Sequence, residues 1–239
     1  MAKRFGNRFM INKNIQLLFN LKKKKIYEKD NFLVSSSNKE AYKLIDRWPK
    51  WPSRKIIIFG ETGTGKTHLS NIWKKKTSAV VLNLNKFKKI KFDNFFLKKK
   101  FFIIENISNI FDKINKNEKE HLEKHLLHFY NLIEEKKGYL ILTASNSPKF
   151  WGINLPDLKS RILSSISVKI KKPDDELLSS VLIKLFLDKQ ILIDKKIIKF
   201  IVYRSERSLT NLQKIVNKID KQSLITKKKI NINFVRKLI

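Results

Sequence analysis

A glycine-rich stretch between a short apolar run and a helical segment constrains the fold of this chain more than any other feature. The apolar run covers residues 55–59, and residues 67–75 can continue as a helix. Between them lies the pattern GxxxxGK[ST], formed by Gly60, Glu61, Thr62, Gly63, Thr64, Gly65, Lys66 and Thr67. Glycines let the backbone turn tightly and direct its N–H groups at phosphate oxygens, and a helix N-terminus adds partial positive charge. The succession of strand, turn and helix predicts a phosphate-binding loop (P-loop), the alternative being a turn that only resembles one.

The residues at the end of this loop have distinct expected roles. Lys66 is expected to reach the β- and γ-phosphates of a bound nucleotide. Thr67 is expected to offer its hydroxyl to Mg²⁺, which prefers oxygen ligands and keeps several waters. His68 follows in the same helix, and we include it among the nucleotide contacts. The expected cofactors are therefore ATP or ADP, together with Mg²⁺.

Four further apolar runs have the length and composition of buried strands. They cover residues 79–84, 101–105, 139–143 and 166–170. With residues 55–59 they predict an α/β fold built on a five-stranded parallel sheet.

Polar residues at the ends of these strands are candidates for chemistry, because ligands bind at the carboxyl ends of parallel strands. Glu105 is expected to hold Mg²⁺ directly or through water, and we place it with Asn106 in the catalytic group. An amide can orient a water but cannot take its proton, so Asn106 predicts weak intrinsic ATP hydrolysis. Ser145 or Asn146 is expected to sense the γ-phosphate, the alternative being a plain turn.

A long helix is expected between Asn117 and Gly138. Asn117 is the expected N-cap, with Glu120 placed to complete a capping box. His121 and His125 are four residues apart, which is the spacing of two metal ligands on one helix face. No third ligand is near them in the sequence, so a solvated helix face is favoured over a metal site.

The alternation of strands and helices ends at Pro173, after which only helices are expected. The chain is therefore divided into three parts. Residues 1–30 are rich in Lys and Asn and are expected to form a flexible arm. Residues 31–172 form the expected α/β core, and residues 173–239 a small all-α lid domain.

Composition excludes some classes of protein and leaves the role of the charge open. The chain has no cysteine, which excludes disulfides and thiolate metal sites. No apolar stretch approaches the roughly 20 residues needed to span a bilayer, so we expect a cytoplasmic protein without a membrane partner. The net charge is +32, from 53 Lys and Arg against 21 Asp and Glu. Because the lysine runs are scattered, this charge fits weak non-specific DNA binding or a biased coding composition equally well.

These features together resemble the AAA+ ATPases of the DnaA family, and within it the Hda-like regulators. The resemblance covers about residues 14–239 and rests on the P-loop and on residues 30–34, 37–38, 104–107, 142–143, 155–161 and 182–190. DnaA carries a DNA-binding helix-turn-helix domain after its lid, whereas this sequence reaches Ile239 at the end of the lid. We therefore expect an Hda-like regulator of DnaA.

The resemblance implies a catalytic role for Arg161. Hda-like proteins are brought to ATP-bound DnaA by the DNA-loaded sliding clamp, the β subunit of DNA polymerase III. They stimulate ATP hydrolysis by DnaA and so negatively regulate the initiation of DNA replication. An arginine supplied in trans completes the active site of DnaA, and the matching residue here is Arg161. Without the resemblance, a surface salt bridge would be the favoured role.

Two further residue assignments follow from the resemblance. The clamp-binding peptide corresponds to Gln16, Leu17, Leu18 and Phe19, although one residue of the usual motif is missing between the leucines; the alternative is a segment packed on the core. The lid arginine that touches the γ-phosphate in DnaA corresponds to Thr210, and Arg207 is expected to replace it.

Three alternatives to this assignment stay open. Two are other functions: a DnaC-like helicase loader and a DNA-binding AAA+ protein with weak ATPase activity. The third concerns the oligomeric state, since self-association into a homo-oligomer is compatible with each of these functions.

Overall fold

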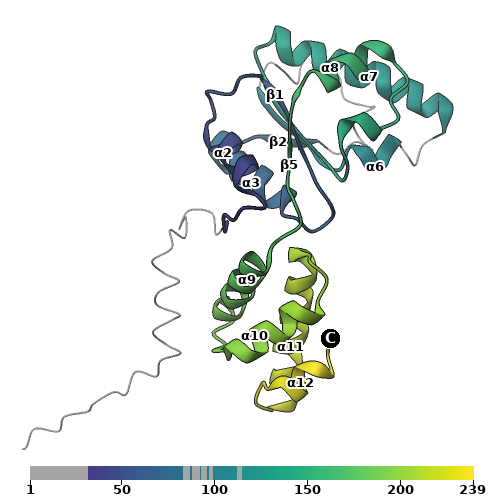
Figure 1. Cartoon of the computed structure of the whole chain (residues 1–239). Helices are drawn as coiled ribbons and strands as arrows, with labels where there is room; N and C mark the ends of the chain where they lie inside the picture. The colour runs from purple at the N-terminus through teal and green to yellow at the C-terminus, as the bar shows by residue number, and fades with distance from the viewer. Residues whose placement is uncertain (1–31, 83–86, 88–91, 93–95, 97–98, 112–114) are drawn as a thin grey trace, which may run out of the picture.

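The protein consists of an α/β unit followed by a helical unit (Figure 1). The computed structural model describes residues 32–82, 87, 92, 96, 99–111 and 115–239. The predicted clamp-binding peptide, Gln16 to Phe19, and the rest of the predicted arm lie outside the described residues. No helix in the described part of the chain is long and apolar enough to cross a membrane.

A five-stranded parallel sheet forms the centre of the first unit, as predicted. Its strands, in spatial order, are β2 (Val80–Leu82), β3 (Phe101–Ile104), β4 (Tyr139–Ala144), β1 (Lys55–Phe59) and β5 (Ile166–Lys169). The central strands are runs of apolar residues that are buried on both faces, which is typical of a parallel sheet covered by helices. Because β4 lies between β1 and β3, the carboxyl ends of these three strands are adjacent.

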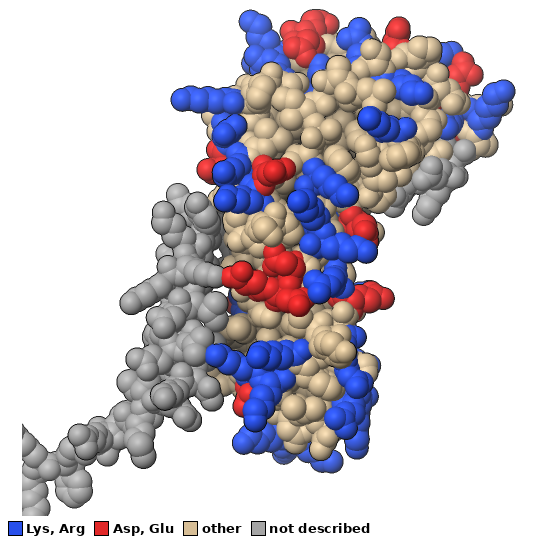
Figure 2. All heavy atoms as spheres, in the orientation of Figure 1, with Lys and Arg blue, Asp and Glu red and all other residues tan. Residues whose placement is uncertain are grey.

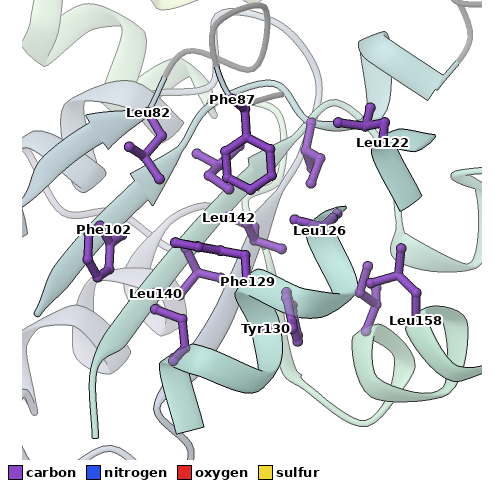
Figure 3. Packing of buried hydrophobic residues seen from close by; sticks show 14 of the residues in the cluster. Leu82, Phe87, Phe102, Leu122, Leu126, Phe129, Tyr130, Leu140, Leu142 and Leu158 are labelled. Atoms are coloured by element: carbon purple, nitrogen blue, oxygen red, sulfur yellow. The ribbon is translucent and has the colours of Figure 1, made fainter. Parts of the chain in front are cut away.

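Helices cover both faces of the sheet. Successive side chains of a strand point to opposite faces, so the apolar strands need a helical layer on each side. On one face, helices α2 (Lys39–Asp46) and α3 (Lys66–Thr77) pack on a core that includes Ile103. On the other face, α7 (Lys116–Glu135) and α8 (Pro156–Leu163) pack on a second core. Figure 3 shows this second core, in which Phe102, Leu140 and Leu142 from the sheet meet Leu126, Phe129 and Tyr130 from α7. Two short helices, α6 (Ser108–Phe111) and η1 (Pro148–Phe150), complete the unit.

Helix α7 begins earlier than the sequence predicted. Its N-cap is Asn115, whose Oδ1 accepts a hydrogen bond from Glu118 N at 2.9 Å. The predicted cap, Asn117, lies inside the helix, and Glu120 pairs with Lys124 at 2.7 Å instead of closing a capping box. Either asparagine can cap a helix, but the helix begins two residues earlier than expected, so the prediction of Asn117 as the N-cap is wrong.

Four helices form the second unit: α9 (Asp175–Asp188), α10 (Lys195–Arg204), α11 (Leu209–Thr226) and α12 (Ile232–Arg236). Each is capped by a polar side chain that accepts from a backbone N–H of the first turn; the caps are Asp174, Asp194, Ser208 and Asn231. The helices enclose their own apolar core, which is separate from the two cores of the sheet. This all-α unit agrees with the predicted lid.

Candidate functional site

The P-loop lies at the carboxyl end of β1, and its backbone takes the conformations for which glycine is required. Gly63 has a φ of +80°, and Gly65, the N-cap of α3, has a φ of +100°. A side chain at Gly63 would also meet the lid, because its Cβ would lie 2.0 Å from Ser208 Oγ. The loop is thus shaped by its glycines and is in contact with the helical unit.

Lys66 lies at the start of α3 and is buried. Its Nζ donates hydrogen bonds to the loop carbonyls of Gly60, at 2.7 Å, and Glu61, at 2.8 Å. Burial lowers the pKa of the Lys66 ammonium from its ordinary value of 10.5. A phosphate beside Nζ would favour the charged form again, so this lysine is suited to binding an anion.

The other loop residues divide into a structural and an exposed group. Thr64 is buried, and its hydroxyl donates to Glu61 O at 2.9 Å, which fixes the turn. Thr67 and His68 are exposed in the first turn of α3, where a phosphate or metal ion can reach them. The ring of His68 packs edge-on against Phe32, with 5.2 Å between the ring centroids. Thr62 is exposed, as is Glu61, which forms an ion pair with Lys172 at 3.0 Å.

Glu105 follows β3 and faces helix α3. Its Oε1 lies 3.2 Å from the hydroxyl of Ser70, a buried residue one turn beyond Thr67 in α3. The same hydroxyl lies 3.0 Å from Thr67 O. Ser70 therefore links the predicted Mg²⁺ ligands, a contact that the sequence did not reveal.

A hydroxyl and a carboxylate suit Mg²⁺, provided that water and nucleotide oxygens supply the other ligands. Among the described residues, no group of three His, Cys, Asp or Glu side chains forms a site for a metal ion held by protein alone. The residues present thus fit a metal ion that binds together with a nucleotide. His121 and His125 do not belong to such a group either. His125 is half-buried, contrary to the predicted solvated face, and its Nε2 donates to Phe87 O at 2.9 Å.

Hydrogen bonds join the segments that follow β3 and β4. Asn106 is exposed, has a φ of 54°, and donates its N–H to Thr143 Oγ1 at 3.1 Å. Ser145 donates its N–H to Ser108 Oγ at 3.1 Å, and the two hydroxyls lie 2.9 Å apart. Thr143 and Ser108 were not selected from the sequence, although a threonine at the end of an otherwise apolar strand is a usable signal. These bonds join the residues after β3 to the end of β4. Asn106 and Ser145 therefore both lie at the carboxyl end of the sheet, where the P-loop also lies.

The lid contacts the P-loop through the start of α11. Leu209 N donates to Gly63 O at 2.8 Å. Arg207, the predicted phosphate contact, is bonded elsewhere: its guanidinium donates to Pro173 O at 3.2 Å and pairs with Asp175 at 2.7 Å. In this structure Arg207 therefore ties the lid to its own first helix, while Ser208 and Leu209, which the sequence did not single out, lie over the loop.

Arg161 is exposed on helix α8, whose opposite side is anchored by the buried Leu158 and Ile162. Within the described residues, its guanidinium has no ion-pair or hydrogen-bond partner, so the salt-bridge alternative finds no support there. The helix leads into β5, whose first residue, Ile166, pairs with Ile56 near the start of β1. The P-loop follows the other end of β1. At the rise of about 3.3 Å per residue in a strand, Gly60 lies roughly 13 Å from Ile56. Arg161 thus lies at the end of the sheet opposite to the chain's own P-loop.

The positive charge is spread over the face that Figure 2 shows. Lys and Arg lie on both units there, and one cluster of Asp and Glu lies near the place where the units meet. Two hollows have basic linings. One, of about 810 Å³, follows α3 and includes Lys74 and Lys75; the other, of about 320 Å³, lies in the lid and includes Lys214 and Lys218.

Comparison with known proteins relates both units to one group of replication proteins. Residues 21–171 match the family described as the bacterial DnaA ATPase domain, and residues 179–239 match the Hda lid domain. The chromosomal replication initiator protein DnaA of Buchnera aphidicola subsp. Cinara cedri is 25% identical over an alignment of 248 residues that covers 95% of this chain and 55% of that protein. The chain spans about half the length of the curated relatives it matches.

Solved structures agree with the AAA+ fold predicted from the sequence. Domain III of Thermotoga maritima DnaA superposes with a TM-score of 0.72 at 18% identity, over 90% of this chain and 96% of that one. DnaA from Aquifex aeolicus with bound AMPPCP gives a TM-score of 0.64 at 17% identity, over 84% of this chain and 66% of that one. At this identity the likeness establishes the fold, and the contacts described above carry the chemistry.

Proposed function

The chain belongs to the family of bacterial DnaA ATPase domains, and from this premise we propose that it is a nucleotide-binding regulator of DnaA. In the cytoplasm it acts with the DNA-loaded sliding clamp, stimulates ATP hydrolysis by DnaA and so limits the initiation of replication. The match of its second unit to the Hda lid domain supports the regulator over an initiator.

Nucleotide binding uses the P-loop. Gly63 and Gly65 shape the cradle, Lys66 supplies the charge for the phosphates, and Thr67 with Glu105 holds Mg²⁺. When bound, Mg²⁺ neutralises phosphate charge and orients the nucleotide. Asn106 cannot act as a base, so the chain's own turnover is slow and the nucleotide mainly stabilises the competent shape.

The observation that carries the proposal is the exposed guanidinium of Arg161, which has no partner among the described residues and lies at the end of the sheet away from its own P-loop. In that position it cannot serve the chain's own nucleotide and is available to another ATPase. A guanidinium supplied in trans spreads positive charge over a phosphoryl group in transit, which is worth about 10³–10⁵ in rate.

The test is ATP hydrolysis by the cognate DnaA on clamp-loaded DNA, with and without this protein. We expect stimulation that is lost in Arg161→Ala and kept in Lys159→Ala, a control at another exposed position of α8. Binding of ADP should be unchanged in both variants. Full stimulation by Arg161→Ala would refute the role of this residue.

The clamp peptide is the second part of the proposal and rests on sequence. Substituting Leu18 and Phe19 by Ala should remove binding to the β clamp and leave ADP affinity intact. Stimulation should then need a much higher protein concentration, because recruitment is lost while Arg161 remains.

DNA binding is the alternative function, favoured by the net charge of +32 and the two basic hollows. Affinity that comes only from phosphate contacts falls steeply with salt. Binding of DNA that persists at physiological salt, in the absence of DnaA stimulation, would favour a DNA-binding ATPase or a helicase loader. Stimulation of ATP hydrolysis by a second copy of the chain itself would instead indicate a homo-oligomer.

A further inference from the structure

Helix α7 carries a buried carboxylate, Glu123, which is only 1% exposed. It accepts hydrogen bonds from two consecutive backbone N–H groups. Asn154 N lies 3.0 and 3.2 Å from its two oxygens, and Leu155 N lies 2.7 Å from one of them. A buried charge is costly unless it is bonded, and these contacts satisfy it with groups 31 and 32 residues away in sequence.

The two N–H groups lie directly before helix α8, which begins at Pro156. The N-cap of α8 is Leu155, a residue without a side-chain acceptor, so the helix has no local cap. Glu123, from another helix, instead accepts the N–H of the N-cap residue Leu155 itself and that of Asn154 before it. Its negative charge also faces the positive end of the α8 dipole.

The segment that enters α8 is held on both sides of this contact. Trp151 and Ile153 are buried, and Trp151 Nε1 donates to Asn146 O at 3.1 Å. Within α8, Leu158 and Ile162 are buried in the same core as α7. The apolar contacts fix which side of α8 faces the core, and the bonds to Glu123 fix its position along its axis.

We propose that Glu123 is a positioning residue for Arg161, a role that rests on the proposed function of Arg161. Glu123 holds the start of α8 in a fixed position. The guanidinium of Arg161, in the last turn of the helix, is therefore held at a fixed position relative to the sheet. A misplacement of about 1 Å in a catalytic group can cost on the order of 10²-fold in rate, so the anchor matters although it never touches the partner's nucleotide.

The test compares Glu123→Ala and Glu123→Gln with Leu132→Ala. The last variant removes apolar contacts near the other end of α7 and leaves Glu123 in place. At temperatures where every variant is folded, Glu123→Ala should lower the maximal stimulation of DnaA about 10- to 100-fold, with ADP affinity unchanged. Glu123→Gln, which retains an acceptor oxygen, should recover part of the stimulation. Leu132→Ala should stimulate like the wild type. In the Arg161→Ala background, Glu123→Ala should cause no further loss.

Amide hydrogen exchange provides a readout that does not involve DnaA. Exchange at Asn154 and Leu155 should be about 10- to 100-fold faster in Glu123→Ala and unchanged relative to other amides in Leu132→Ala. If the wild type fails to stimulate DnaA, the proposed function falls, and exchange alone decides whether Glu123 holds α8. Equal exchange in Glu123→Ala and wild type, or an equal loss of stimulation in Glu123→Ala and Leu132→Ala, would overturn the positioning role. If Glu123→Ala does not fold, Glu123→Gln carries the same comparisons.

Discussion

The P-loop and helix α8 hold their key cations in opposite ways. Lys66 is buried and bonded inward to the carbonyls of its own loop, and the lid rests on that loop through Leu209. Arg161 is exposed and unpaired within the described residues, while the contacts that position its helix lie behind it, at Glu123 and Leu158. The cation that we assign to the chain's own ligand is thus enclosed by backbone, whereas the cation that we propose for a partner is exposed on an anchored helix.

The two regions also lie at opposite ends of the sheet, which makes them separable by mutation. If the comparison is right, changes at the P-loop alter nucleotide binding and leave α8 in place, and changes behind α8 do the reverse. Coupled losses in both regions would instead mean that nucleotide and Arg161 act through one shared conformational change.

The largest effect confined to the P-loop is expected for Lys66→Ala. The variant removes the ammonium that we assign to the β- and γ-phosphates, so the affinity for ADP and ATP should fall about 100-fold or more. Titration with a fluorescent ADP analogue measures this loss. Lys124→Ala, an exposed lysine on α7, is the control and should bind like the wild type. Faster amide exchange at Asn154 or Leu155 in Lys66→Ala would break the separation between the two regions.

A smaller effect is expected for Ser70→Ala, which removes the hydroxyl beside Glu105. Groups that orient metal ligands typically contribute 10- to 100-fold to metal affinity, so the Mg²⁺ concentration needed for tight ADP binding should rise about 10-fold. ADP affinity in EDTA should not change. Ser223→Ala is a matched control, because its hydroxyl also bonds a carbonyl three residues earlier in its helix, Asp220 O at 2.8 Å. An unchanged Mg²⁺ requirement in Ser70→Ala would show that Glu105 is held without Ser70.

The sequence predicted the P-loop side of the molecule well, because the signals there are local. A β-branched run, three glycines and a helical segment follow one another within about 20 residues, and Glu105 ends the next central strand. What the pattern did not include are contacts across the fold, such as Ser70 with Glu105 or Leu209 with Gly63.

The α8 side was less predictable, because its important contacts join residues far apart in sequence. Glu123 is one of several charged residues along α7, and only its burial distinguishes it from the exposed Glu120 and Lys124. Arg207 was expected at a phosphate and pairs with Asp175, since the geometry at the start of α9 decides its partner. His125 was expected in solvent, but its ring packs edge-on against Phe87 and its Nε2 donates to Phe87 O. Each case depends on tertiary packing that a one-dimensional pattern does not contain.

The smallest expected effect concerns acid and is confined to the α7 side. Burial lowers the pKa of His125 below its ordinary value of 6.5, against the opposing hydrogen bond to Phe87 O, and the nearby His121 and His128 lower it further. The unfolded chain therefore takes up the proton first as pH falls. The stability contributed by neutral His125 is complete above about pH 6.5 and is lost as pH falls from there through the lowered folded pKa.

Thermal melts at pH 7.5 and pH 5 should show a smaller acid-induced loss of stability in His125→Gln than in wild type. His68→Gln, an exposed position on α3, should keep the wild-type difference. Lower amide protection in α7 at pH 5 than at pH 7.5, relative to intrinsic exchange at each pH, with unchanged protection around the P-loop, would confirm that the two regions respond separately. An equal acid response in wild type and His125→Gln would show that this ring does not contribute to it.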